Sequence, residues 1–237
     1  MLARPALKRR SGFSLVELVT VIAVIGILIA LIVPAVGGIQ DGARKTQAAN
    51  KLRQIAQSYQ AYLQQTGGQK PILASDAYDF AAKLAETAEL NVPDVWIVDE
   101  DPLVVAASGT RPAVVALPPS GEATTWMPAA EFEAYPLSFA VATRLNPAAP
   151  AATTPLAWTR GLATDGTWNA ADATAHPGVY GEEGGHVVFL DGHVKFYPSL
   201  AEDGGQLQHY TTKARTANIQ EAISPGAQAV DMGGSAY

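Results

Sequence analysis

The chain of 237 residues is long enough for one globular domain with an additional element, and its 48% hydrophobic composition is sufficient for a buried core. It contains no cysteine, which excludes disulfide bonds and thiolate metal sites. The formal net charge is −6, but residues 1–12 hold four basic residues and no acid, so the remainder carries −10. Because binding to nucleic acid requires clustered Lys and Arg, we expect no nucleic-acid partner for this acidic body.

An apolar segment follows the basic start of the chain. Residues 13–36 read FSLVELVTVIAVIGILIALIVPAV, and Glu17 is their one strongly polar side chain. At a rise of about 1.5 Å per residue, this segment forms a helix of about 36 Å, which exceeds the roughly 30 Å of hydrocarbon in a bilayer. The preceding basic cluster predicts a cytoplasmic N-terminus and a body outside the cytoplasm.

Glu17 bears on three interpretations of this segment: a secretory signal, a single-pass anchor, or a helix used both in a membrane and in a polymer. A carboxylate inside an apolar span costs roughly 2.5 kcal/mol or more near the bilayer centre, and such residues usually serve a function. A side chain that reaches the headgroups is the simpler alternative. In favour of a secretory signal, Ala35-Val36-Gly37 offers small residues at the spacing of a signal-peptidase site.

Residues 9–36, RRSGFSLVELVTVIAVIGILIALIVPAV, resemble the N-terminus of type IV prepilins and type II secretion pseudopilins. The resemblance implies that a prepilin peptidase cuts between Gly12 and Phe13 and N-methylates Phe13. It places the family's glutamate at Glu17, where the carboxylate would neutralise the α-amino group of a neighbouring subunit. It also places Pro34 where the helix of this family is commonly kinked or melted on assembly.

The same resemblance implies a protein of the bacterial inner membrane with a periplasmic head, which joins other pilin-like subunits through an inner-membrane assembly platform. Type II secretion pseudopili and type IV pili share this N-terminus, and the absence of cysteine favours the pseudopilus. We expect that the protein is not an enzyme and binds no cofactor, because its sequence contains no nucleotide-binding loop and no G-x-S-x-G or H-E-x-x-H pattern. The alternative is a membrane-tethered ligand-binding or enzymatic domain that does not polymerise.

For the whole chain we predict an α+β fold, in which a long N-terminal helix, half transmembrane and half amphipathic, packs on a head with a small antiparallel sheet. An apolar stripe with helical spacing indicates the amphipathic half; its members are Leu52, Ile55, Ala56, Tyr59, Tyr62 and Leu63. We expect a second helix over 77–90, capped by Asp76. The predicted parts are a leader at 1–12, a transmembrane and polymerisation helix at 13–36, an amphipathic helix at 37–66, a head at 67–215 and a flexible tail at 216–237.

Within the head, apolar runs at 95–98, 103–106 and 113–117 predict short strands. Asp191-Gly192 between two β-rich runs predicts a two-residue hairpin turn of type I′. With that turn, one face of the hairpin would hold Val187, Phe189, Val194 and Phe196.

This hairpin resembles the end of the H-x9-DG motif of prepilin-like proteins. The motif's histidine position falls on Gly181, whereas His176 and His186 lie at other spacings, so only the Asp191-Gly192 turn is carried over. Some pseudopilins bind calcium near the C-terminus, and carboxylates are the ligands that calcium requires. The weak candidates are Glu202, Asp203 and Asp231, which have no recognisable ligand spacing.

Overall fold

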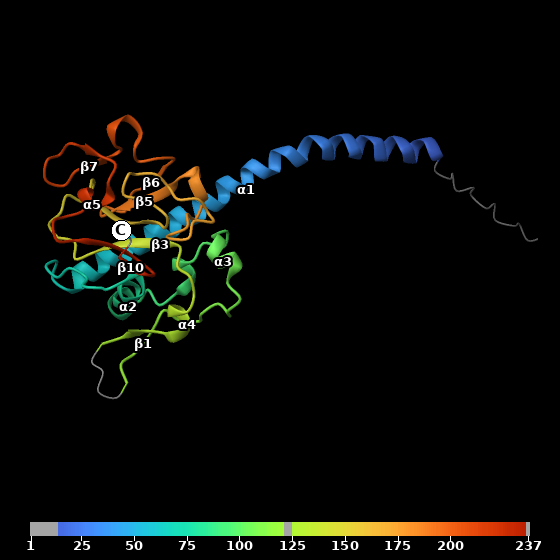
Figure 1. Ribbon diagram of the computed structural model, residues 1–237. Helices are drawn as coiled ribbons and strands as arrows, with labels where there is room; N and C mark the ends of the chain where they lie inside the picture. Colours follow the sequence, from blue (N-terminus) through green and yellow to red (C-terminus); the bar gives the residue numbers. More distant parts are fainter. Residues whose placement is uncertain (1–13, 121–124, 236–237) are drawn as a thin grey trace, which may run out of the picture. The chain divides into compact units, whose positions relative to one another are not determined.

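The computed structural model describes residues 14–120 and 125–235, without the side chains of residues 31–41 and 235. Helix α1 runs from Leu15 to Gln65, and the chain divides within it into two compact units, residues 1–45 and residues 46–237. The fold is mixed α+β, with a long N-terminal helix followed by a head that contains a small antiparallel sheet (Figure 1). This arrangement confirms the fold class predicted from the sequence.

The part of α1 in the second unit belongs to the core of the head. Its predicted apolar stripe is confirmed, because Leu52, Ile55 and Ala56 have no exposed surface and Tyr59 is 1% exposed. The helix ends as its glycines predict. Gly67, with φ of 73°, donates from its N–H to the carbonyl of Gln64, and the Gly68 N–H donates to the carbonyl of Leu63 at 2.6 Å. This pair of hydrogen bonds is a Schellman motif, in which a left-handed glycine satisfies the last carbonyls of the helix.

Helix α2, Ala77–Ala88, confirms the second predicted helix. The Asp76 carboxylate accepts a hydrogen bond from the Asp79 N–H at 2.9 Å and so caps the first turn. Phe80 on the buried face of α2 stacks on Tyr59 of α1, with 6.1 Å between ring centroids. This contact joins the two helices within one core.

The principal sheet has six antiparallel strands in the order β10-β9-β3-β4-β5-β6. Its strands are β3 (Phe139–Thr143), β4 (Pro155–Thr159), β5 (Gly185–Phe189), β6 (Val194–Tyr197), β9 (Gln228–Asp231) and β10 (Gly234–Ser235). Four further strands form two separate antiparallel pairs: β1 (Ala116–Leu117) with β2 (Met127–Pro128), and β7 (Leu207–Gln208) with β8 (Arg215–Thr216). The central strands β3 and β4 are buried along their whole length, as expected for strands covered on both faces.

Short helices complete the head, and two of them replace predicted strands. The strand predicted at 95–98 is wrong, because η1 (Pro93–Trp96) is a 3₁₀ helix, and the strand predicted at 103–106 is wrong, because α3 (Pro102–Ala106) is an α-helix. In both, proline begins the first turn, where its fixed φ favours a helix and its missing N–H costs nothing. The others are α4 (Ala130–Glu133), η2 (Gly181–Glu183), η3 (Glu202–Gly204) and α5 (Ile219–Ala222).

The flexible tail predicted at 216–237 is also wrong over the described residues. Strand β9 lies inside the principal sheet, between β10 and β3, with Ala229 opposite Ala142. Ala229 and Val230 are each 3% exposed. The segment is ordered because its backbone completes the hydrogen-bond ladder of β3. Its small side chains give no strand signal in the sequence, so this pairing was not predicted.

A buried ion pair lies in the core of the head. Arg160 Nη2 is 2.7 Å from Asp101 Oδ1, and both side chains are fully buried. Arg160 also donates to the carbonyls of Leu137 and Pro177, while Ser138 donates to Asp101 Oδ2 at 2.7 Å. These hydrogen bonds tie the segment before α3 to the sheet and to the loop before β5, and they satisfy both charges in the core.

Candidate functional site

The candidate assembly site is the start of α1, where Ser14 and Glu17 cap each other. The Ser14 N–H donates to Glu17 Oε2 at 2.8 Å, and the Glu17 N–H donates to Ser14 Oγ at 3.2 Å. This reciprocal pair is a capping box, which satisfies two donors that have no partner inside the helix. The S-x-x-E spacing before an apolar run is a sequence signal for it. The carboxylate is thereby held at the first turn, where the helix dipole favours negative charge.

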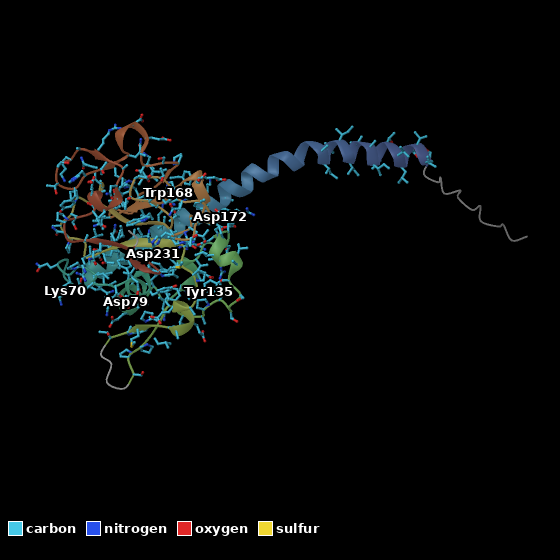
Figure 2. The ribbon with its side chains drawn as sticks, in the orientation of Figure 1. Lys70, Asp79, Tyr135, Trp168, Asp172 and Asp231 are labelled. Carbon is cyan, nitrogen blue, oxygen red and sulfur yellow. The ribbon has the colours of Figure 1, made fainter. Side chains whose placement is uncertain are left out.

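The surface of α1 around and beyond Glu17 is apolar and exposed. The large side chains with 48% to 78% exposure are Leu15, Val16, Leu18, Val19, Val21, Ile22, Val24, Ile25, Ile27, Leu28 and Ile29. Figure 2 shows the side chains of this part of the helix projecting above and below the ribbon. Each would gain about 1.5 to 3 kcal/mol if it were transferred fully from water into an apolar environment. A helix that is apolar on every side requires such an environment.

Several predicted site residues lie outside the described part of the chain. These are Gly12 and Phe13, at the predicted cleavage site, and the side chain of Pro34. Cleavage, methylation and the kinking or melting of the helix at Pro34 therefore stay predictions. Within the residues whose side chains the structure describes, 14–30, 42–120 and 125–234, no helix combines the length and hydropathy needed to cross a membrane.

The Asp191-Gly192 turn is present, but its predicted type is wrong. The Gly192 N–H donates to the Phe189 carbonyl at 2.8 Å, and the Phe189 N–H donates to the His193 carbonyl at 3.0 Å. Three residues, Leu190 to Gly192, therefore connect Phe189 to His193. Only Gly192 among them has a positive φ, of 88°, whereas a type I′ turn requires a positive φ at two successive residues.

The extra turn residue shifts the hairpin register by one position. Val187 lies opposite Lys195 and Val188 opposite Val194. The predicted face of Val187, Phe189, Val194 and Phe196 is therefore wrong, because a slip of one residue exchanges the two faces of a strand. The observed register places Phe189, His193, Lys195 and Tyr197 on one face instead.

The calcium candidates do not converge. Among the residues that the structure describes, no group of three or more His, Cys, Asp or Glu side chains is arranged to hold a metal ion. Asp231 is buried in β9, and its two oxygens accept from His176 Nδ1 at 2.5 Å and from the Gly233 N–H at 2.8 Å. Glu202 and Asp203 lie in the separate turn η3. Figure 2 labels Asp231 within the head.

The contact of His176 with Asp231 was not predicted, because 55 residues separate the two in the chain. It links the loop before η2 to the C-terminal strand β9 and borders a cavity of about 300 Å³ that is also lined by Leu103 and Met232. The two histidines considered for the H-x9-DG motif thus have different surroundings. His186 lies in β5, and its ring contacts Phe196 edge-on at 5.0 Å.

Comparison with known families finds a match at the N-terminus. Residues 7–33 match the family model for the prokaryotic N-terminal methylation motif, the signature of type IV pilins and pseudopilins. No curated protein and no solved structure matches the chain. The motif confirms the resemblance that the sequence indicated.

Proposed function

We propose that this chain is a prepilin-like structural subunit that is cut between Gly12 and Phe13, N-methylated at Phe13, and polymerised through α1 into a type II secretion pseudopilus or a type IV pilus-like filament. The methylation motif at residues 7–33 supports the broader statement, a subunit of the prepilin type. Assembly is supported above all by one observation: the exposed apolar surface of α1 carries a capped carboxylate, Glu17, at its start.

The carboxylate and the new terminus would form a complementary pair. Cleavage would create an α-amino group at Phe13, whose ordinary pKa of about 7.7 to 8.0 keeps it mostly cationic at neutral pH. In a bundle of apolar helices, the Glu17 carboxylate of one subunit would pair with this cation of the next. Removing one partner of a buried ion pair costs about 3 to 5 kcal/mol, so the pair would select a single register between subunits.

The environment of α1 follows from its surface. Before assembly we place it in the bacterial inner membrane, with the N-terminus in the cytoplasm and the head in the periplasm. After assembly, the helices of other subunits would replace lipid around the same side chains. Prepilin peptidase, other pilin-like subunits and an inner-membrane platform are the expected partners, and catalysis forms no part of this proposal.

The first test is the mature N-terminus, measured by mass spectrometry on protein from membranes with and without an active prepilin peptidase. We expect a peptide that begins with N-methylated Phe13, formed only when the peptidase is active. Gly12→Val should abolish it by placing a branched side chain at the scissile bond. Gly26→Ala is the matched control, because a Cβ at Gly26 meets no atom within 4 Å.

Two outcomes would contradict the proposal in different ways. A terminus between residues 35 and 38 would identify a secretory signal and a released head. An uncut Met1 would identify a permanent anchor, which is the alternative of a tethered domain that does not polymerise.

A further inference from the structure

A groove of about 350 Å³ lies between the β5–β6 hairpin and the β7–β8 pair. Figure 1 shows β5, β6 and β7 in the same part of the head. The hairpin contributes Phe189, His193, Lys195 and Tyr197, the four side chains that the three-residue turn brings to one face. Arg215 of β8 also lines the groove. The volume is within the range of small-molecule sites, about 300 to 1,000 Å³.

The groove is basic on an otherwise acidic body. Its lining includes Lys195 and Arg215 and no Asp or Glu. Lys195 Nζ lies 4.5 Å from the centroid of the Tyr197 ring, and Arg215 Nη1 is 3.5 Å from the backbone carbonyl of Asp203. Within the described residues, neither cation forms an ion pair with a carboxylate. Both side chains are exposed, so both can bind an anion from solution.

Aromatic rings form the apolar part of the lining. The His193 ring stacks on Phe189, with 4.2 Å between centroids and 7° between planes. Asp191 Oδ1 contacts His193 Nδ1 at 2.6 Å and fixes the orientation of this ring. Burial raises the pKa of Tyr197, and the Lys195 ammonium lies over its ring. Flat rings beside cations suit a ligand that has one apolar face and one negative group.

We propose that this groove binds an acidic sugar, a pyranose that carries a carboxylate. Arg215 and Lys195 would hold the carboxylate, Arg215 through its planar fork, and the exposed face of the His193 ring, opposite Phe189, would cover the C–H face of the sugar. The side-chain amides of Gln206 and Gln208 also line the groove and can donate to or accept from sugar hydroxyls. An extended polyanion fits less well, because the body outside residues 1–12 carries −10 and would repel it.

The test is a calorimetric titration of the full chain in detergent with methyl D-galacturonoside. Methyl D-galactoside is the matched neutral probe, and inorganic phosphate and adenosine monophosphate are the anionic probes. We expect saturable binding of the galacturonoside that is about tenfold or more tighter than that of the other three, since the neutral galactoside lacks the charged hydrogen bond and the two phosphate probes lack a pyranose that carries a carboxylate. The measurement uses single chains, so its result does not depend on filament assembly.

Substitutions locate the site. Arg215→Gln and Lys195→Gln should each weaken binding of the galacturonoside by about tenfold, and Arg215→Lys should restore part of it. Lys70→Gln is the control, because Lys70 is an exposed cation outside the groove lining (Figure 2). Equal thermal midpoints would show that the variants are folded. The proposal is overturned if the galacturonoside does not bind, if any of the other three probes binds equally well, or if both groove variants bind like the wild type.

Discussion

Leu15 exposes 78% of its surface and Leu52 exposes none, although both lie in α1. The side chains from Leu15 to Ala30 are all exposed, whereas the buried side chains of α1 in the second unit form a continuous core with α2 and the sheet. The same secondary structure therefore serves two purposes. The first region has apolar side chains that are exposed among the described residues, and the second region buries its own.

This difference separates the expected effects of substitution. Changes in the first region should alter association and leave the stability of the head unchanged, because the described side chains there make no contribution to the core. Changes in the second region should alter the free energy of unfolding of the head. The predictions below test this separation, from the largest expected effect to the smallest.

Glu17→Ala should cause the largest loss, at the level of assembly. An α-ammonium left unpaired in an apolar bundle costs about 3 to 5 kcal/mol, equivalent to a reduction of about a hundredfold to several thousandfold in subunit association. Filaments sheared from cells and collected by centrifugation measure this loss. Thr20→Val is the control, because the described hydrogen bond of the Thr20 hydroxyl goes only to the carbonyl of Glu17. Normal filaments from Glu17→Ala would show that the carboxylate has no role in assembly.

Arg160→Met should cause the largest loss within the head. It leaves the Asp101 carboxylate buried without its cation, and we expect the free energy of unfolding to fall by about 3 to 5 kcal/mol. Urea unfolding of the full chain in detergent, followed by the fluorescence of buried Trp96 and Trp158, measures this change.

The double variant Arg160→Met with Asp101→Leu separates the ion pair from its surroundings. It removes both charges, so it should be more stable than Arg160→Met alone. A double variant that is less stable than the single one would show that the neighbouring hydrogen bonds, and not the paired charges, dominate this part of the core.

The predictions from sequence succeeded where one local signal had one structural meaning. The 3–4 spacing of Leu52, Ile55 and Tyr59 has no strand equivalent, and an aspartate directly before an apolar helical pattern is a specific cap signal. The motif at the N-terminus was likewise recognisable in the sequence, because its polar and apolar residues match a known family model. The motif was therefore predictable from the sequence, whereas the role of Glu17 in assembly stays a prediction.

They failed where the same residues permit two structures. Asp191-Gly192 suits a two-residue turn and also a three-residue turn that ends in a left-handed glycine, and only the paired strands decide between them. The third residue of the turn sets the hairpin register and so determines whether Lys195 faces the groove. Four apolar residues at 103–106 fit a strand or a helical turn equally well. The partners Asp101 and Arg160 are 59 residues apart, and no local pattern joins them.

Asp76→Ala should have a moderate effect on the head, because it removes the acceptor for the Asp79 N–H at the start of α2. The expected loss is about 1 kcal/mol, the typical contribution of an N-cap. Asp76→Asn is the matched control, since an asparagine side chain caps equally well, and it should retain wild-type stability in urea. A similar loss in both variants would indicate that the charge of Asp76, and not its hydrogen bond, stabilises the helix.

Arg111→Gln should have the smallest effect, because its partners lie at the surface. Arg111 pairs with Asp99 and lies 3.3 Å from Asp94, whose side chains are 56% and 64% exposed, so solvent screening limits the loss at pH 7 to under about 1 kcal/mol. The hydrogen bond from Arg111 lowers the pKa of Asp99 below its ordinary value of 3.8. A lowered carboxyl pKa stabilises the folded state above the unfolded pKa, and this contribution disappears as the pH falls through the folded pKa. The difference between wild type and Arg111→Gln in urea unfolding should therefore be constant from pH 7 to about 5 and should shrink below about pH 4. A difference that persists undiminished at the lowest pH would mean that Arg111 stabilises the head through the packing of its aliphatic stem and not through its charge.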